Sequence, residues 1–508
     1  MITAENVFQL NPETTPAEPA PELVPPPSAP VKVARLIHEE QIEAGQHLLR
    51  WRGDWWAYVG PHWAIVDPEA LRKGVYNRLE NAQYAVKGKG DEPEVKPWNP
   101  DTAKVNKVVD AMVSLTLLPQ EVDAGTHLPT RSPAALIPMS NGLLDPTNRA
   151  HYLPSPDLFF TYAVPVHYTA DAPEPTEWLK FLRSIWPDDG AEEITALQEW
   201  VGYLLSGRTD LQKMVLLVGP PRSGKGTIGR VLKLLMGAEN VVSPTLASLG
   251  QNFGLWPWIG KTLALIGDAR LHGKGQDELV ERLLSISGED SLTIDRKHQQ
   301  PWSGRLGARV MLLSNELPRF GDASGAIASR FIVLKMTKSY LGSEDIELDD
   351  RLRAELPGIL LWALAGLDRV REQRRLSEPT TSLEAKQQLE ELVSPIKAFI
   401  REVVEVDVTA STPFARVYEQ YQQWCLETGR HAKNQAGFSS DLSTAQPELK
   451  TDHRPRDANG TKMPRHIKGL RVSSEWTNRV KDYGQAFATM PMQRQGQPMH
   501  NAGTPWPN

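Results

Sequence analysis

The 508-residue sequence predicts an α/β fold whose largest domain is built on a parallel sheet. Three short apolar runs, at 214–218, 262–266 and 310–313, show no alternation with polar residues. Uninterrupted runs of this length are typical of strands buried on both faces of a parallel sheet. After the first run, apolar residues recur at helical spacing, at Ile228, Val231, Leu232 and Leu235. Strand and helix signals therefore alternate, as a parallel sheet requires.

Two different segments precede this core. Residues 1–34 are rich in proline and poor in large apolar residues, so we expect a disordered tail. From residue 35 the composition becomes globular, and a tryptophan-rich stretch predicts a strand meander in an N-terminal α+β domain. Its tryptophans are expected mainly in the core, with base stacking as the alternative for one of them: Trp51, Trp55, Trp56 and Trp63. Two helices, between 178 and 205, are predicted before the core.

A glycine-rich turn follows the first buried run. It consists of Gly219, Pro220, Pro221, Arg222, Ser223, Gly224, Lys225, Gly226 and Thr227. The glycines allow backbone N–H groups to turn toward phosphate oxygens, and Lys225 can reach the terminal phosphates of a nucleotide. The residue after this lysine is usually a Ser or Thr that binds Mg²⁺, but here it is Gly226, which leaves Thr227 as the candidate metal ligand.

Polar residues end the next two runs. Asp268 follows the second run, where a carboxylate can hold Mg²⁺ directly or through water. Asn315 follows the third, where an amide can orient the attacking water. Arg330 follows a helix of small residues, and its guanidinium could reach the phosphates bound by a neighbouring subunit. The plainer alternatives are a capping aspartate and a surface ion pair.

The C-terminal part has the pattern helix, helix, hairpin, which predicts a winged-helix-like domain. Asn459-Gly460 is a strong hairpin turn between two basic arms. Four residues of these arms are candidate DNA-binding residues: Arg454, Arg456, Lys462 and Arg465. A solvated basic hairpin without a ligand is the alternative. The last residues, 474–508, are polar and expected to be disordered.

Bulk properties restrict the function class only loosely. The formal net charge of −6 gives no global positive field, so contacts with DNA must come from local clusters. The single cysteine, Cys425, excludes an internal disulfide and a cysteine-based zinc site, which fits a reducing compartment. No apolar stretch is long enough to span a membrane and no signal-peptide pattern opens the chain. We therefore expect a cytoplasmic protein without a membrane partner.

Together these motifs resemble the superfamily 3 helicases, specifically the phage and plasmid primase-helicases related to the poxvirus enzymes. The resemblance covers most of the chain and rests on five segments: NGLLD at 141–145, GPPRSGKGT at 219–227, LALIGDARL at 263–271, SISGEDSLTIDRKHQQPW at 285–302 and SNELPRFGDASGAIASRF at 314–331. It implies that Lys225 is the Walker A lysine, Asp268 the Walker B acid, Asn315 the first sensor and Arg330 the arginine finger.

The resemblance also implies an AAA+-type P-loop ATPase core that uses ATP and Mg²⁺. Such cores assemble as a homo-oligomeric ring, usually a hexamer, around single-stranded or forked DNA. The segment DRKHQQ falls where these helicases carry a channel hairpin, which makes Lys297 and His298 candidate DNA-binding residues. A separate primase partner and the cytoplasm of a bacterial host are expected with this family. Residues 35–165 lack the paired acids and Ser-x-His of a primase-polymerase, so no priming activity is expected from this chain.

Two rival functions remain open. GPPRSGKGT also resembles the loop of adenylate-kinase-type phosphotransferases, although those enzymes begin at the loop. Gly226 and the unpaired acid after Gly267 suit a DNA-binding initiator that assembles with ATP and hydrolyses little of it. The predicted order of domains is a tail (1–34), an N-terminal domain (35–165), the ATPase core (166–345), a helical linker (346–384), the winged-helix-like domain (385–473) and a second tail (474–508).

Overall fold

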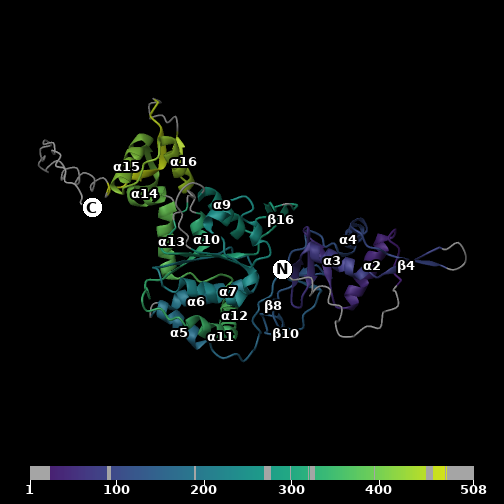
Figure 1. The fold of residues 1–508 in the computed structure, drawn as a ribbon. Coiled ribbons are helices and arrows are strands. Elements are labelled where there is room, and N and C mark those ends of the chain that lie inside the picture. Colours follow the sequence, from purple (N-terminus) through teal and green to yellow (C-terminus); the bar gives the residue numbers. More distant parts are fainter. Residues whose placement is uncertain are drawn as a thin grey trace, which may run out of the picture. The chain divides into compact units, whose positions relative to one another are not determined.

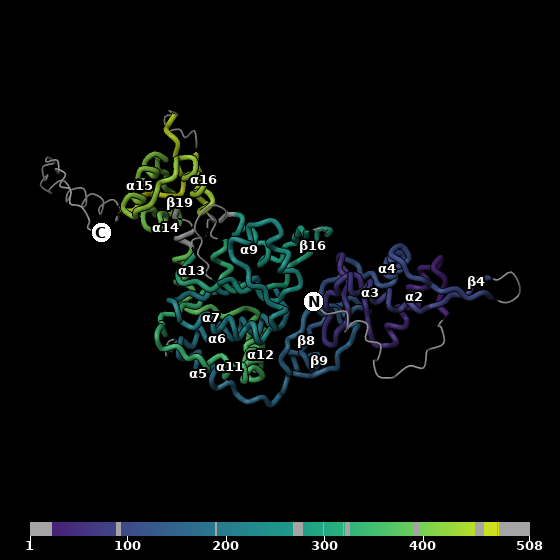
Figure 2. Tube along the Cα trace, in the orientation of Figure 1, coloured from purple at the N-terminus to yellow at the C-terminus, as the bar shows by residue number. Residues whose placement is uncertain are grey.

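The computed structural model describes residues 23–87, 93–187, 190–267, 276–297, 299–318, 320, 326–393, 395–452, 462–474 and 476. The chain divides into two compact units, one with the described residues up to Leu389 and one with those from Glu390 onward. Figure 1 and Figure 2 show the course of the chain through both units, with the numbering of the elements used below. Both units mix helices and strands, which agrees with the predicted α/β class.

The N-terminal part of the first unit opens with helix α2 (Pro30–Glu43), strands β1 (Leu48–Trp51), β2 (Asp54–Tyr58) and β3 (Trp63–Val66), and helix α3 (Pro68–Leu79). Strands β4 (Gln83–Val86) and β5 (Glu94–Pro97) and helix α4 (Thr102–Thr116) follow. Strands β1 to β3 form an antiparallel meander, as predicted. The four tryptophans of this stretch are at most 5% exposed, which confirms that they are core residues.

The expected tail of 1–34 is wrong in its last third. Pro30 occupies the first turn of α2, where a missing N–H costs nothing, and Val33 and Ala34 are fully buried. Val24 is buried as well, and its N–H donates to the carbonyl of Gln83 at 2.7 Å. Buried apolar residues on both sides of the prolines therefore make this segment part of the N-terminal core.

Six short strands connect this part to the core. They are β6 (Thr126–His127), β7 (Ser132–Pro133), β8 (Ile137–Met139), β9 (Gly142–Leu144), β10 (His151–Tyr152) and β11 (Leu158–Phe159), and they form two small antiparallel sheets. Phe159 packs against the rings of Trp51, Trp56 and Trp63, which joins these strands to the meander.

The central sheet has five parallel strands in the order β13-β14-β17-β12-β18. Their bounds are β12 (Met214–Val218), β13 (Val241–Val242), β14 (Leu263–Ile266), β17 (Arg309–Ser314) and β18 (Phe331–Lys335). All five residues of β12 and all four of β14 are buried, as expected of strands covered on both faces. The prediction of a parallel sheet from the three apolar runs is confirmed.

Helices cover both faces of this sheet (Figure 1). On one face lie α5 (Thr176–Ile185), α6 (Ala191–Leu205), α7 (Lys225–Met236), α11 (Leu348–Ala354) and α12 (Leu356–Gln373). On the other lie α9 (Gln276–Ser287) and α10 (Ala326–Arg330), and α13 (Thr380–Val393) follows α12 in the chain. The short elements η1 (Ala238–Asn240), α8 (Leu246–Leu249) and η2 (Trp256–Trp258) lie between α7 and β14 in sequence.

Helices α6 and α12 approach each other closely at two glycines. A Cβ at Gly202 would lie 2.5 Å from the backbone nitrogen of Leu367, and one at Gly366 would lie 2.8 Å from that of Glu199. The segment 346–384 is therefore not the linker that we expected. It contains α11 and α12, whose buried residues belong to the same core cluster as those of α6 and the sheet.

A two-stranded hairpin, β15 (Leu292–Ile294) and β16 (Trp302–Gly304), lies between α9 and β17 in sequence. It holds the DRKHQQ segment predicted as a hairpin tip. Within the described part of the chain, no helix combines the length and the apolar character needed to cross a membrane.

The second unit contains α14 (Pro395–Val403), β19 (Val404–Pro413), α15 (Phe414–Glu427), α16 (Gln435–Ala445), β20 (Lys450–Asp452) and β21 (His466–Val472). The strands form one antiparallel sheet in the order β19-β21-β20. Phe399, Tyr421, Trp424 and Phe438 pack ring against ring in its core. The pairing of β20 with β21 confirms the predicted hairpin, although Asn459-Gly460 lies outside the described residues.

Candidate functional site

The glycine-rich loop connects the carboxyl end of β12 to the first residue of α7. Gly224 has φ +98°, a conformation that L side chains rarely adopt, and a Cβ there would lie 3.1 Å from the ring of Phe181. A Cβ at Gly219 would lie 2.7 Å from Met336. The backbone path therefore favours a glycine at 224, and a close neighbour favours one at 219.

Lys225 is the residue around which this loop is organised. Its Nζ donates to the carbonyls of Gly219 at 2.6 Å and Pro220 at 2.8 Å, and to Ser223 Oγ at 3.1 Å. The side chain is 9% exposed, and burial lowers the pKa of its amine. Among the described residues no carboxylate forms an ion pair with Lys225. A buried cation held only by neutral oxygens suits a site that receives an anionic ligand.

A cavity of about 700 Å³ opens beside Lys225, within the size range of small-molecule sites. Residues 221–227 of the loop form one wall, and Asn315, at the end of β17, lines the same cavity. The structure therefore brings the loop and Asn315 together, as the order of the sheet requires. Asp268 lies outside the described residues.

The segment that follows β18 forms another wall of this cavity. Ser339 Oγ donates to the carbonyl of Pro221 at 2.8 Å, and the N–H of Tyr340 donates to that of Arg222 at 2.9 Å. Further residues that line the cavity, from α5, α7 and the segment after β18, were not anticipated from the sequence: Glu177, Arg230, Asp345, Asp349 and Arg351. Of these, only Arg230 could have been anticipated, because it lies three positions after Thr227 in a predicted helix and therefore on the same face.

Thr227, the candidate metal ligand, faces a guanidinium. Arg230 donates through Nη2 to Thr227 Oγ1 at 3.0 Å, and through Nε to Asp349 at 2.6 Å. One lone pair of the hydroxyl is thus engaged by a cation. The loop fits the phosphates of a nucleotide through its backbone and Lys225, while Thr227 would have to exchange Arg230 for Mg²⁺ before it could ligate the metal.

Arg330 does not lie in the loop's cavity. It ends α10, and Phe331 after it pairs with Met214 at the amino end of β12, whereas the loop starts after Val218 at the carboxyl end. Four strand residues separate these positions, or about 13 Å. The guanidinium donates to the side chain of Gln212. The structure therefore separates Arg330 from the loop of its own subunit.

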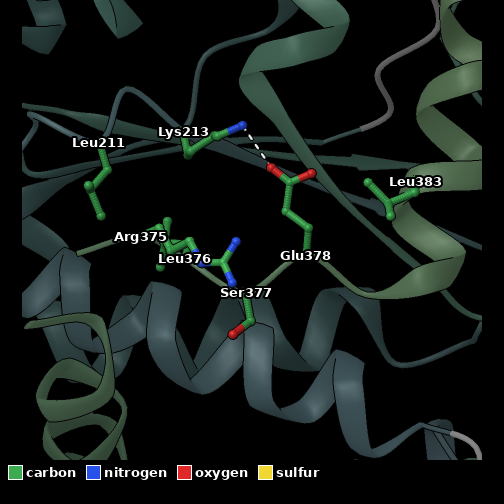
Figure 3. A pocket seen from close by; sticks show the side chains of 7 residues that line it. All are labelled: Leu211, Lys213, Arg375, Leu376, Ser377, Glu378 and Leu383. Carbon is green, nitrogen blue, oxygen red and sulfur yellow. Dashed lines mark hydrogen bonds and ion pairs between the residues drawn. The ribbon is translucent and has the colours of Figure 1, made fainter. Parts of the chain in front are cut away.

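Close to Arg330, Lys213 lies at the amino end of the sheet beside a cavity of about 480 Å³ (Figure 3). Its Nζ donates to the carbonyl of Ser329 and to Glu378 Oε1, both at 2.8 Å. Figure 3 shows Lys213 and Glu378 reaching toward each other from β12 and the segment before α13. Lys386 donates to the other oxygen of the same carboxylate. These two ion pairs of Glu378 connect the chain after α12 to the sheet.

Two neighbouring cations at the hairpin tip differ in their exposure to solvent. Lys297 is exposed, whereas Arg296 is 7% exposed and donates through Nη1 to both oxygens of Asp54, at 2.9 and 2.7 Å. Arg296 Nε also donates to the carbonyl of Gln300 at 3.0 Å. The predicted DNA-binding residue Lys297 is therefore free to meet a ligand, while Arg296 anchors the turn. His298 lies outside the described residues.

The basic arms of the second unit are described only in part. Lys462 is exposed, and Arg454 and Arg456 lie outside the described residues. Arg465 stacks over the Phe414 ring at 3.8 Å and donates to Ser439 of α16; burial lowers the pKa of its guanidinium. Arg465 thus has a packing role that the basic pattern did not reveal.

Two family models match separate segments of the chain. Residues 48–187 match the family described as D5 N terminal like, and residues 217–330 match a family of unknown function, DUF5906. The first match spans β1 to α5, and the second begins in β12 and ends at Arg330.

Solved structures share the fold of most of the chain. The apo structure of the NrS-1 C terminal region (305–718) has a TM-score of 0.52 at 13% identity and covers 86% of this chain and 99% of that chain. The A form apo structure of the same region has a TM-score of 0.51 at 12% identity, with 86% and 100% covered. The chain thus combines a D5 N terminal like segment and a DUF5906 segment in a mixed α/β fold similar to that of the NrS-1 C terminal region.

Proposed function

We propose that this protein is an ATP-dependent DNA helicase of the phage or plasmid replication type, which unwinds duplex DNA as a ring moving on single-stranded DNA. One observation carries the proposal. Lys225 is buried and has no carboxylate partner among the described residues, and it lies in a glycine loop at the carboxyl edge of a parallel sheet, which is where open α/β sheets bind their ligands. The match of residues 48–187 to the D5 N terminal like family supports a role in phage replication.

The topology supports the AAA+-type core implied by the sequence resemblance. Strand β12, which precedes the loop, lies between β17 and β18, so that Asn315 at the tip of β17 lines the loop's cavity. In the second unit, the order helix, strand, two helices and a hairpin supports a winged-helix-like domain. Its wing would carry Arg454, Arg456, Lys462 and Arg465 toward DNA phosphates.

Within the cavity, we assign each residue a role. The backbone N–H groups of the loop would bind phosphate oxygens, and Lys225 would compensate the charge of the β- and γ-phosphates. Asp268 and Thr227 would hold Mg²⁺, which supplies charge neutralisation on the same phosphates when bound. Asn315 would position the attacking water. The general base has no assigned residue.

The ring is proposed from the position of Arg330. Arg330 lies at the amino end of the sheet, and the loop lies at the carboxyl end of β12, about 13 Å along the strand, so the proposed finger would act on the nucleotide of a neighbouring subunit. A homo-oligomer, of six subunits by resemblance, would place Lys297 and His298 around a central strand of DNA. We further propose that the substrate is forked DNA, that a separate primase is a partner, and that the protein acts in the host cytoplasm.

The experiment is strand separation on forked DNA with ATP, together with ATP turnover with and without single-stranded DNA. A helicase should separate the strands and turn over ATP faster when DNA is present. DNA binding and assembly with ATP but little turnover would favour the initiator alternative, which the contact between Arg230 and Thr227 supports. A protein that binds neither ATP nor DNA would reject both the helicase and the initiator.

A further inference from the structure

A third cavity, of about 450 Å³, lies at the opposite edge of the central sheet from the loop. Arg309, the first residue of β17, lines this cavity. Ser314, the last residue of the same strand, lies at the end that faces the loop's cavity. The wall also includes the β1–β2 turn, the chain between β16 and β17, and residues 123–125, 133–136, 160–162, 206–209 and 259–262. This cavity is therefore separate from the proposed nucleotide site.

Arg309 is a buried cation that forms no ion pair with any residue that the structure describes. It is 5% exposed, its Nη1 donates to the carbonyl of Gly307, and its Nε and Nη2 have no hydrogen-bond partner among the described residues. The nearby acids are engaged elsewhere: Asp210 accepts from Arg208 at 2.6 Å, and Glu289 accepts from Thr209. Burial lowers the pKa of the Arg309 guanidinium, and Tyr162, Tyr203, Asp210 and Glu289 offset only part of that shift.

Two more cations on the wall lack an acidic partner in the described part of the chain. Lys261 donates to the backbone carbonyl of Glu239, and burial lowers the pKa of its amine. Arg305 is exposed and makes no ion pair there. The other two guanidinium groups on the wall are compensated, since Arg52 pairs with Asp123 and Arg208 pairs with Asp210. The wall carries two carboxylates, and with Asp123 paired to Arg52, three cations without an ion pair share the wall with the carboxylate of Glu289.

The wall also carries an unpartnered neutral donor. Trp56 is 3% exposed, and its Nε1 has no acceptor among the residues that the structure describes. Buried N–H groups are almost always hydrogen-bonded, so two orphaned donor groups on one cavity wall call for acceptor atoms. An anion with several oxygens would supply acceptors and the missing negative charge together.

A single water is the simplest rival occupant. A void of about 20 Å³ beside Arg309 has room for one water, which could accept from one of the two free N–H groups. A water carries no charge, however, and a buried guanidinium without a counter-charge remains costly after one hydrogen bond is made. The rival also leaves Lys261 and Arg305 unexplained.

We propose that this cavity binds a phosphate group, with Arg309 and Lys261 as inner ligands and Arg305 at the rim. The group can come from a small anion, such as inorganic phosphate or pyrophosphate, or from the backbone of a single-stranded nucleic acid. Both sources present the same tetrahedral oxygens to the same cations.

The test uses the full-length chain with Lys225→Ala, which removes the main cation of the loop's site, so that the result does not depend on the proposed helicase function. Equilibrium dialysis with labelled phosphate and pyrophosphate should show saturable binding at one site per chain. Lys261→Gln and Arg309→Gln should each weaken it roughly tenfold or more, as expected when a charge-assisted contact is lost. Arg309→Lys, which keeps the charge, should weaken it less. Lys73→Gln, at an exposed lysine of α3, is the matched control and should change nothing.

A second arm identifies the source of the phosphate. A short oligothymidylate that binds more tightly than phosphate, and loses that affinity in the same variants, would assign the site to a nucleic-acid backbone. Phosphate binding without competition by the oligonucleotide would assign it to a small anion. If Arg309→Gln does not fold, Lys261→Gln combined with Arg305→Gln provides the same comparison from partly exposed positions. Binding that is equal in all variants, or no stoichiometric binding, would overturn the proposal in favour of a bound water.

Discussion

At Lys225, the loss of one amine should separate nucleotide-dependent activity from folding. We predict that Lys225→Ala abolishes ATP hydrolysis, because the other cation of the loop, Arg222, pairs with Glu344 at 3.3 Å and leaves Lys225 to compensate the terminal phosphates. The change should lower turnover at least about a hundredfold, equivalent to roughly 2.7 kcal/mol of barrier. Lys233→Ala, at an exposed lysine on the same helix, is the control. Turnover of the Lys225 variant within twofold of the unchanged protein would refute the assignment.

The exposed tip of the β15–β16 hairpin provides the second residue-level prediction. Alanine at both Lys297 and His298 should weaken binding to single-stranded DNA and reduce its dependence on salt, because each cation removed is one phosphate contact fewer. Basal ATP turnover without DNA should stay unchanged, since Lys297 is on the hairpin and not in the loop's cavity. Fluorescence anisotropy at several salt concentrations measures both quantities. Lys107→Ala, at an exposed lysine of α4, is the control, and equal affinity in the double variant would reject the role.

At the scale of elements, the hairpin is attached to the β1–β2 turn by the buried pair of Asp54 and Arg296. Their side chains are 15% and 4% exposed. We predict that Asp54→Ala or Arg296→Ala alone destabilises the first unit by about 3–5 kcal/mol, because each leaves an unpaired buried charge. The double variant should cost less than the sum of the two. Urea unfolding of all four proteins measures the coupling, and simple additivity would show that the pair is not coupled.

The crossing of α6 and α12 provides a second prediction at this scale. Gly366→Val should destabilise the first unit by more than about 2 kcal/mol, because a Cβ at this position meets the backbone of α6 and the helices would have to separate. Ala365→Val, at the exposed neighbouring position, introduces the same side chain without that contact. Thermal unfolding of both variants checks the prediction. An equal shift in the two would mean that the close approach is not limiting.

These elements also indicate what a sequence can predict. The three buried runs and the glycine loop were readable, because uninterrupted apolar runs and a turn with fixed chemistry are local patterns. The partnership of Asp54 with Arg296 was not, since 242 positions separate the two and no local pattern links a turn to a distant hairpin. Segment 346–384 was misjudged as a linker for a similar reason. The close approach of α6 to α12 at Gly366 depends on two helices that are distant in sequence, so no local pattern reveals it.

For the whole molecule, the location of Arg330 leads to a test of assembly. Arg330→Ala should bind ATP yet hydrolyse very little, because arginine fingers contribute about 10³ to 10⁵ in rate in other phosphate-cleaving enzymes. Mixtures of this variant with Lys225→Ala should regain turnover, since some interfaces then combine an intact Lys225 with an intact Arg330.

Native mass measurement must show that mixed assemblies form. Each variant alone, at the same total concentration, is the control. Mixed assemblies that stay as inactive as either parent would exclude an Arg330 that acts between subunits. The proposed ring mechanism would fall with it, whereas ATP binding by the loop would still stand on Lys225.

The Asp54–Arg296 pair has a mechanical consequence as well. A hairpin joined to the N-terminal meander by this pair can move separately from the meander only if the contact between Asp54 and Arg296 breaks. We therefore expect the β1–β2 turn and the β15–β16 hairpin to move together, with the exposed Lys297 on the hairpin. If Lys297 moves along DNA as proposed, that movement would carry the tryptophan-rich meander with it, so the moving part would be a domain and not a loop.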